Sequence, residues 1–318
     1  MIRPDDGSLS PVQLANVQRH ADRLLREAGA YGRFPTPVAD LLAAAKLTVV
    51  EDELLDEGLL RRFLRRTKSA GAALKSALGK LLGLFDAQDR VVLIDRGVPR
   101  PKKPFVKLHE AGHGFLPHQS GLFAVIHDCE KTLDPDTTDL FEREANVFAS
   151  ETLFQRDAFS AEANDEAFGI RVPMRLAARY GASNYSAFRR YVTESPRACC
   201  VVVLEPSVQG PDGGFEAPIR RVVASESFAR MFDTKSLLTR VDRDHPIGHV
   251  VPIGRRMTAR REVVLRDRNG ADRQCFAEAF DTKHQTFVLV VDNGPVSRSV
   301  LVKPGSATFK KVARRIVL

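Results

Sequence analysis

The chain has 318 residues, a formal net charge of +8 and four cysteines. Its length is sufficient for two or three small domains, and no apolar run approaches the roughly 18 residues that a membrane-spanning helix requires. The N-terminal residues lack the apolar core of a signal peptide, and the cysteines show neither metal-site spacing nor a disulfide framework. The sequence therefore predicts a soluble cytoplasmic protein and argues against one embedded in a membrane.

The first 50 residues predict two helices followed by a strand. Ser10 and Gln13 form a Ser-x-x-Gln capping box with Pro11 at the first helical position, which predicts a helix that ends near residue 28. A second helix is predicted to begin near Thr36, and residues 47–50 have the β-branched composition of a strand. We expect these elements to form part of the scaffold of an N-terminal domain.

Residues 58–83 combine basic pairs with leucines at helical spacing, which predicts a basic amphipathic helix. Such a helix suits nucleic acid, a membrane surface or an acidic partner, although a surface helix with its apolar stripe packed on the core is the more common case. The following residues, 83–92, predict a hairpin that turns around Asp86–Asp89. Its first arm is a candidate for the edge strand along which an extended peptide binds.

A strand followed by a helix in the middle of the chain carries the strongest chemical signal. Residues 89–95 predict a short buried strand, and Pro104 suits the first turn of a helix that contains a His-Glu-x-x-His motif. Residues four apart share one face of a helix, so His109 and His113 can direct both imidazoles at one ion. Glu110 lies close enough to reach a water at that ion. Two imidazoles suit Zn²⁺ in a catalytic site that keeps one position open.

A catalytic zinc site requires a third protein ligand. The best candidate lies in the amphipathic helix predicted for residues 136–153, where Glu142 and Asn146 share one face. A metal ligand and a supporting amide could act together there. Glu144 points elsewhere on the same helix, and we expect it to be solvated.

Three further side chains remain open as alternative ligands. They are His118, His127 and Asp128, which fall at loop or strand positions without a helical partner. A lone histidine at such a position is more often a surface residue than a ligand.

The two motifs, in this order, resemble the ImmA/IrrE metallo-endopeptidases, a bacterial gluzincin-like family. The likeness rests on Val-Lys-Leu-His-Glu-Ala-Gly-His after a strand and on Glu-Arg-Glu-Ala-Asn-Val-Phe-Ala about thirty residues later, and it is sharp over roughly residues 88–155. The resemblance implies Zn²⁺ held by His109, His113 and Glu142, with Glu110 as the catalytic base. It also implies a protein substrate, often a helix-turn-helix transcriptional repressor that is cut in a stress-response or mobile-element switch.

Residues 174–191 have the outline of a helix-turn-helix. The pattern predicts a helix, a tight turn at Gly181, a cap at Ser183 and a second helix. Arg189 and Arg190 on the second helix would suit contacts with phosphates. Many helical hairpins share this outline, so DNA remains a candidate partner rather than an established one.

From Pro196 onward, short strand-like runs predict a mainly antiparallel β domain, with a hairpin turn at Asp267–Gly270. The resemblance implies a GAF-like sensor at this place in some relatives. Residues 251–318 contain 14 Lys and Arg against 6 Asp and Glu, an excess of 14 − 6 = +8. This excess would favour nucleic acid or an acidic partner, although a solubilising surface explains it slightly better.

The sequence thus predicts an α+β protein in three parts: a zincin-like peptidase domain at 1–156, a helical helix-turn-helix-like segment at 157–195 and a β-rich domain at 196–318. The predicted function is that of a zinc-dependent endopeptidase. The alternatives are a DNA-binding transcriptional regulator with a structural or vestigial zinc site and a module that only binds its partner. An open ligand position beside Glu110 favours the peptidase, because a structural site does not need one. Candidates for the donor that stabilises the oxyanion are Tyr180, Tyr185 and His127.

Overall fold

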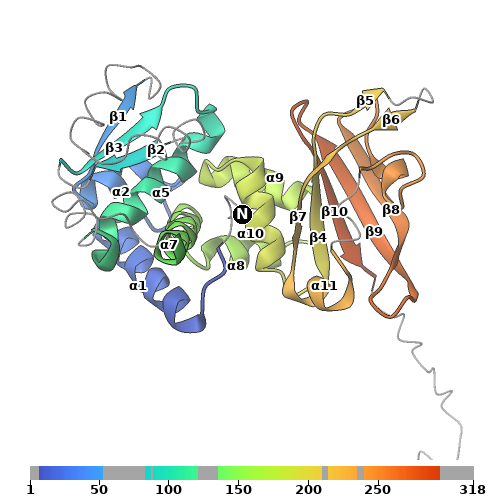
Figure 1. Cartoon of the computed structure of the whole chain (residues 1–318), viewed down its shortest axis with the longest axis horizontal. Coiled ribbons are helices and arrows are strands. Elements are labelled where there is room, and N and C mark those ends of the chain that lie inside the picture. Colours follow the sequence, from blue (N-terminus) through green and yellow to red (C-terminus); the bar gives the residue numbers. More distant parts are fainter. Residues whose placement is uncertain are drawn as a thin grey trace, which may run out of the picture. The chain divides into compact units, whose positions relative to one another are not determined.

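The computed structural model describes residues 7–52, 83–86, 89–120, 135–209, 214–234 and 240–293. The chain divides into two compact units, Met1–Ser195 and Pro196–Leu318. Both units combine helices with sheets, which confirms the predicted α+β class (Figure 1). The basic helix predicted for residues 58–83 lies, apart from Gly83, outside the described residues, as do His127 and Asp128. No helix in the described part of the chain is both long and apolar enough to cross a membrane.

The sheet of the first unit has three described strands: β1 (Thr48–Asp52), β2 (Gly83–Asp86) and β3 (Val91–Asp95). Their order is β1-β3-β2, with β1 parallel to β3 and β2 antiparallel to it. Strands β2 and β3 form the predicted hairpin, and β2 lies at an edge of the described sheet. The three central residues of β3 are buried, as expected of a strand with a continuous apolar run.

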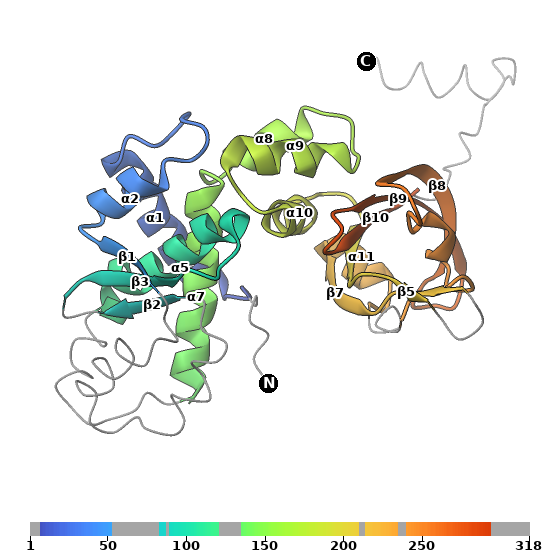
Figure 2. The same cartoon turned by 90° about the horizontal axis from the view of Figure 1, so that it is seen from above.

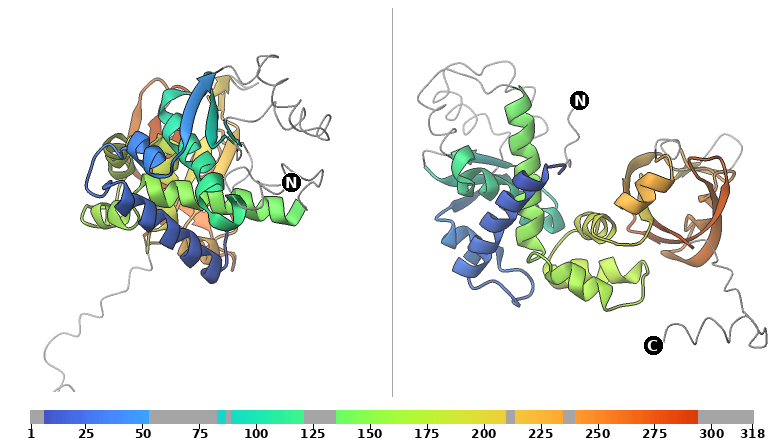
Figure 3. Two further views of the ribbon diagram at one scale, coloured as in Figure 1. Left: turned by 90° about the vertical axis from the view of Figure 1, so that its left-hand side faces the viewer. Right: turned by 90° about the horizontal axis from the view of Figure 1, so that it is seen from below.

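Helices of the first unit pack on this sheet and on one another (Figures 2 and 3). They are α1 (Pro11–Glu27), α2 (Val38–Ala44), α5 (Lys103–Phe115), which follows the short 3₁₀ helix η1 (Arg100–Lys102), and α7 (Pro135–Leu153). Helix α5 contacts β2, β3 and α7, and α7 in turn contacts α1. The helix that carries the His-Glu-x-x-His motif therefore lies between the sheet and the helix that carries Glu142.

Helix α1 begins at the predicted capping box. The backbone N–H of Ser10 donates to Oε1 of Gln13 at 2.9 Å, and the backbone N–H of Gln13 donates to Oγ of Ser10 at 3.4 Å. Its buried face is formed by apolar residues at helical spacing, namely Val17, Ala21, Leu24 and Leu25.

Three further helices of the first unit are described: α8 (Ala158–Asn164), α9 (Arg171–Tyr180) and α10 (Asn184–Thr193). Gly181 ends α9 in the left-handed region with φ of 71°, and Oγ of Ser183 accepts the backbone N–H of Ser186 at 3.1 Å. The two helices and the turn of the predicted helix-turn-helix outline are therefore present.

The prediction that Arg190 is placed for phosphate contacts is wrong. Its side chain on α10 is only 5% exposed, and its Nη1 donates to Oε1 of Glu151 at 2.8 Å. Its Nη2 donates to the backbone carbonyl of Arg156 at 3.0 Å. A buried arginine is stable only when it is paired and hydrogen-bonded, so this side chain joins α10 to α7 rather than pointing to solvent.

The second unit contains a five-stranded antiparallel sheet in the order β7-β4-β10-β9-β8. Its strands are β4 (Cys199–Leu204), β7 (Ile219–Ala224), β8 (Met257–Arg266), β9 (Asp272–Asp281) and β10 (Thr286–Asp292). The unit also has the short pair β5 (Val208–Gln209) and β6 (Phe215–Glu216), helix α11 (Glu226–Met231) and the 3₁₀ helix η2 (Gly248–Val250). The predicted turn at Asp267–Gly270 connects β8 and β9, and Gly270 has a φ of 79° there.

Three cysteines lie in the core of this unit rather than at its surface. Cys199, Cys200 and Cys275 are buried free thiols. Burial raises the pKa of Cys275 to about 12 and raises that of Cys200 as well, so both remain protonated and unreactive at neutral pH.

Candidate metal centre

Helix α5 places both histidines of the motif on one side. The His109 and His113 rings lie 5.0 Å apart between centroids, at an interplanar angle of 83°. Between them, Gly112 faces α7 at close range. A Cβ atom on Gly112 would lie 3.2 Å from Cα of Ala145 and 3.3 Å from Cδ1 of Phe148. Glycine thus permits the close approach of the two helices that carry the predicted ligands.

Glu142 on α7 faces the two imidazoles. Its Oε2 lies 3.3 Å from Nε2 of His109, and its Oε1 lies 3.6 Å from Nε2 of His113. The ligand atoms of these three residues lie within 4.8 Å of one another, and no other group of three or more potential ligands was found in the described residues. Zinc bonds of about 2.0–2.2 Å in tetrahedral geometry separate ligand atoms by roughly 3.3–3.6 Å, so the donor set fits a zinc ion.

Each histidine has an amide partner at its second nitrogen. Nδ1 of His109 lies 3.1 Å from Oδ1 of Asn146, and Nδ1 of His113 lies 2.8 Å from Oε1 of Gln119. Partners of this kind orient a metal-binding imidazole and leave Nε2 available to the ion. The geometry agrees with the predicted supporting role of Asn146, whereas sequence reasoning missed Gln119.

The prediction that Glu144 is solvated is wrong. Glu144 is 3% exposed, and its Oε2 accepts an N–H of Gln119 at 2.7 Å. The same oxygen lies 2.6 Å from Nε2 of His118, whose side chain is 40% exposed. A hydrogen-bond chain therefore runs from His118 near the surface through Glu144 and Gln119 to His113. His118 takes part in this support and is not a member of the ligand cluster.

Glu110 is 8% exposed and sits beside the ligand cluster. Burial raises its pKa from 4.5 to about 7; the positive charge of His109 opposes the rise, and the negative charge of Glu142 adds to it. A carboxyl group with a pKa near neutrality can both take up and release a proton, as general acid–base chemistry requires.

Two of the candidate ligands, His113 and Glu142, have shifted pKa values that leave them in different charge states. Burial lowers the pKa of His113 to about 4, with a smaller contribution from His109, so its imidazole is neutral at pH 7. Burial would raise the pKa of Glu142, but the hydrogen bond from His109 and the positive charge that His113 carries at acidic pH lower it to about 2. The site therefore offers an ionised carboxylate and a neutral imidazole, the forms that bind a metal.

The candidates for an oxyanion donor do not gain support from this geometry. Tyr180 is fully buried and packs against Phe34, Phe154 and Phe159, and its hydroxyl donates to Oε1 of Glu162 at 3.0 Å. Its contacts are those of a core residue. Tyr185 is half-buried on α10, and His127 lies outside the described residues.

Comparison with known proteins agrees with the site. Residues 73–190 match the family model Peptidase_M78, described as an IrrE N-terminal-like domain. This segment includes both motifs of the candidate metal centre, and the match supports membership of the ImmA/IrrE family for this domain. The resemblance inferred from the motifs is confirmed.

Among solved structures, the chain is similar to a Mycobacterium tuberculosis transcriptional regulator. The two share 15% sequence identity with a TM-score of 0.47, over 87% of this chain and 86% of that chain. This similarity is below the level that defines a shared fold. No curated protein matches the sequence.

Proposed function

We propose that this protein is a zinc-dependent endopeptidase. The observation that carries the proposal is the convergence of His109, His113 and Glu142 beside the buried carboxyl group of Glu110. When bound, zinc lowers the pKa of a water and polarises a carbonyl. His109, His113 and Glu142 would hold the ion, with Asn146 and Gln119 orienting the imidazoles.

Glu110 would act as the general base. It would take a proton from the water that attacks the scissile carbonyl and return it to the leaving amine. Its pKa of about 7 in the metal-free site is close to the value at which a carboxyl group can do both at neutral pH. Glu110 is not one of the candidate ligands. A purely structural metal site would not require a carboxyl group at this position, whereas a catalytic site would use it as a base.

The substrate would be another protein, in line with the family resemblance. A helix-turn-helix transcriptional repressor, cleaved to switch on stress-response or mobile-element genes, is the kind of partner we propose. Strand β2 lies at an edge of the described sheet, next to β3. It also contacts α5, the helix that carries Glu110. An extended peptide could add to that edge by backbone hydrogen bonds.

The three-part domain layout also belongs to this proposal. The peptidase domain would extend to residue 156, and the helices at 157–195 would support it, because Arg190 on α10 pairs with Glu151 on α7. The β-rich part from residue 196 would act as a sensor. The pairing of Arg190 also weighs against α10 as a DNA-recognition helix, since this cation is not available to phosphates.

The first test compares new protein N-termini in native cells that carry wild type, Glu110→Gln or Glu226→Gln, before and after stress. Glu226 has an 84% exposed side chain on α11 and undergoes the same chemical change, so it serves as the matched control. We expect a cut with wild type and with Glu226→Gln that is absent with Glu110→Gln. Zinc content of the purified proteins is measured in parallel. Unaltered cleavage by zinc-loaded Glu110→Gln would refute the mechanism.

If no cleavage occurs under any condition although wild type binds zinc, the regulatory alternative gains support. It is then tested by binding of the full chain to DNA over a range of salt concentrations. If the protein contacts DNA phosphates, its affinity for DNA should fall steeply as the salt concentration rises.

A further inference from the structure

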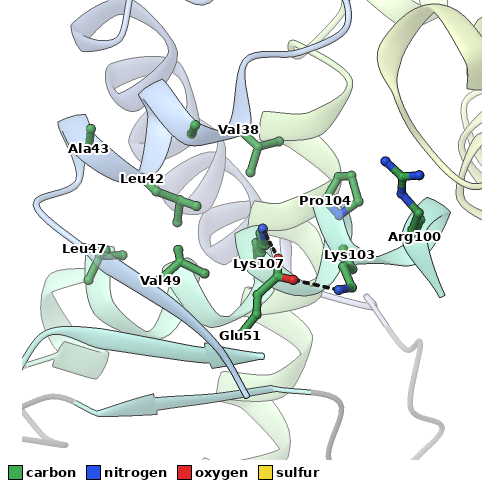
Figure 4. Close-up of a pocket in the computed structure, with 11 residues that line it drawn as sticks. Val38, Leu42, Ala43, Leu47, Val49, Glu51, Arg100, Lys103, Pro104 and Lys107 are labelled. Atoms are coloured by element: carbon green, nitrogen blue, oxygen red, sulfur yellow. Dashed lines mark hydrogen bonds and ion pairs between the residues drawn. The ribbon is translucent and has the colours of Figure 1, made fainter. Parts of the chain in front are cut away.

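A cavity of about 580 Å³ lies beside the metal-bearing helix but apart from the metal ligands. It is bounded by α2, β1 and the beginning of α5 (Figure 4). On α5 its lining includes Lys103 and Lys107, four residues apart on one face. His109 and His113 lie on a different face, on average about 120° away around the helix, because the helix turns by about 100° per residue. A molecule in this cavity would contact α5 without contacting the metal centre.

One wall of the cavity is apolar. It is formed by side chains from α2, from β1 and from the residues that connect them, among them Val38, Leu42, Leu47 and Val49 (Figure 4). Leu42 and Leu47 are at most 6% exposed, so they form a fixed surface that belongs to the core of the unit. This wall suits the apolar body of a ligand.

The opposite wall is rich in cations. The Nζ atoms of Lys103 and Lys107 each lie 2.7 Å from an oxygen of Glu51, so that one carboxylate bridges both ammonium groups. The two lysine side chains are only 19% and 23% exposed. An ammonium group has three N–H donors, and Glu51 is the only ionic partner of either lysine in the described part of the chain. Donors therefore remain for a ligand.

The charge of the cavity is unbalanced. Arg100, which is exposed, adds a third cation to the lining, so three positive groups face the single negative charge of Glu51. This excess of positive charge attracts an anion, and the apolar wall beside it favours one that carries hydrocarbon. A cation would be repelled, and a neutral apolar molecule would offer no acceptor to the N–H donors that Glu51 leaves unused.

We propose that this cavity binds a small organic acid with one carboxylate head group and an apolar body. The carboxylate would lie against Lys103, Lys107 and Arg100, in the manner that Glu51 already shows for its own carboxylate. The hydrocarbon would lie on the wall formed by α2 and β1. Cavities of this volume are typical of small-molecule sites.

The proposal is tested by titrating the full-length, zinc-free protein with octanoate and following binding by calorimetry. We expect saturable binding of one molecule per chain. Acetate, which lacks the body, and octylammonium, which reverses the charge, should bind at least about tenfold more weakly. Octyl phosphate is titrated in parallel to determine whether a phosphate head group replaces the carboxylate.

Variants locate the site. The double change Lys103→Met and Lys107→Met should weaken octanoate binding by at least about tenfold, whereas Lys102→Met removes one exposed cation of η1 that does not line the cavity and should leave binding unchanged. Ala43 is exposed on α2 and lines the cavity, so Ala43→Leu should narrow the cavity and weaken binding while every ion pair remains.

The proposal is overturned if octanoate does not bind, if octylammonium binds equally well, or if Ala43→Leu and the double lysine variant both bind like wild type. Thermal unfolding followed by circular dichroism shows whether each variant is folded. The measurement uses neither zinc nor peptide cleavage, so its outcome is independent of the proposed peptidase function.

Discussion

The side-chain oxygen of Gln119 lies 2.8 Å from Nδ1 of His113. The amide nitrogen of Gln119 donates to Glu144 at 2.7 Å, so the oxygen is the atom that remains to accept the N–H of the imidazole. This arrangement holds the proton of neutral His113 on Nδ1 and leaves the lone pair of Nε2 directed at Glu142. The candidate ligand His113 is thus oriented by a residue that lies beyond the C-terminal end of its own helix.

Gln119→Leu should weaken zinc binding by about 10- to 100-fold, because the change keeps the volume of the side chain but removes the acceptor that orients His113. Zinc affinity is measured on the purified protein by competition with a chelator. Gln209→Leu, at an exposed position of β5 in the second unit, is the matched control and should bind like wild type. Equal affinity of the two variants would show that Gln119 does not position the ligand.

Glu110→Gln should make the metal-free protein more stable at alkaline pH. Glu110 has its pKa raised from 4.5 to about 7 in the folded state, so its contribution to stability is fully present below pH 4.5 and is lost as pH rises through 7. The variant escapes this loss. We expect equal urea midpoints near pH 4.5 and a gain that grows to at most about 3 kcal/mol above pH 7.

The measurement for Glu110→Gln is urea unfolding with a chelator present, at several pH values between 4.5 and 8. Glu226→Gln provides the comparison, because its carboxyl group is exposed and the substitution should change stability little at any pH. A gain for Glu110→Gln that did not depend on pH would contradict the assignment of a buried carboxyl group with a raised pKa.

The regular geometry of helices explains what could be predicted of the site. His109, His113, Glu142 and Asn146 lie on two helices, where a spacing of four residues places side chains on one face whatever surrounds them. The sequence alone therefore predicts which of these side chains can act together. The capping box of α1 and the turn at Gly270 were predictable for the same reason, since both depend on local backbone geometry.

Glu144 and Arg190 could not be predicted because their surroundings are set by tertiary packing. The helical pattern correctly places Glu144 on a different face of α7 from Glu142. It cannot show that this face contacts Gln119 and His118, because those contacts arise from tertiary packing. In the same way, the pattern of α10 gives no sign that Arg190 finds Glu151 on another helix. Charged residues with distant partners resemble solvated ones in the sequence.

Arg190→Ala should destabilise the protein by about 3 to 5 kcal/mol, because it leaves the buried carboxylate of Glu151 without its main partner. Arg26→Ala is the control: Arg26 is 74% exposed in its pair with Asp22, and its removal should cost less than about 1 kcal/mol. Stability is measured by urea unfolding at neutral pH. A double variant, Glu151→Leu with Arg190→Met, should recover part of the loss, since both charges are then removed from the interior.

Gly112→Leu should reduce zinc affinity even though it changes no ligand. The Cβ of any larger residue would lie 3.2 Å from the backbone of Ala145, so α5 and α7 would have to separate, and Glu142 would move away from His109 and His113. A leucine favours helix over glycine by up to about 1 kcal/mol, so a loss of zinc binding could not be attributed to a weaker helix.

The matched control is Gly214→Leu, because a Cβ added to Gly214 would lie in open space. We expect chelator competition to show at least about tenfold weaker binding for Gly112→Leu and wild-type affinity for Gly214→Leu. Wild-type affinity in both would mean that the distance between the two helices does not control the metal centre.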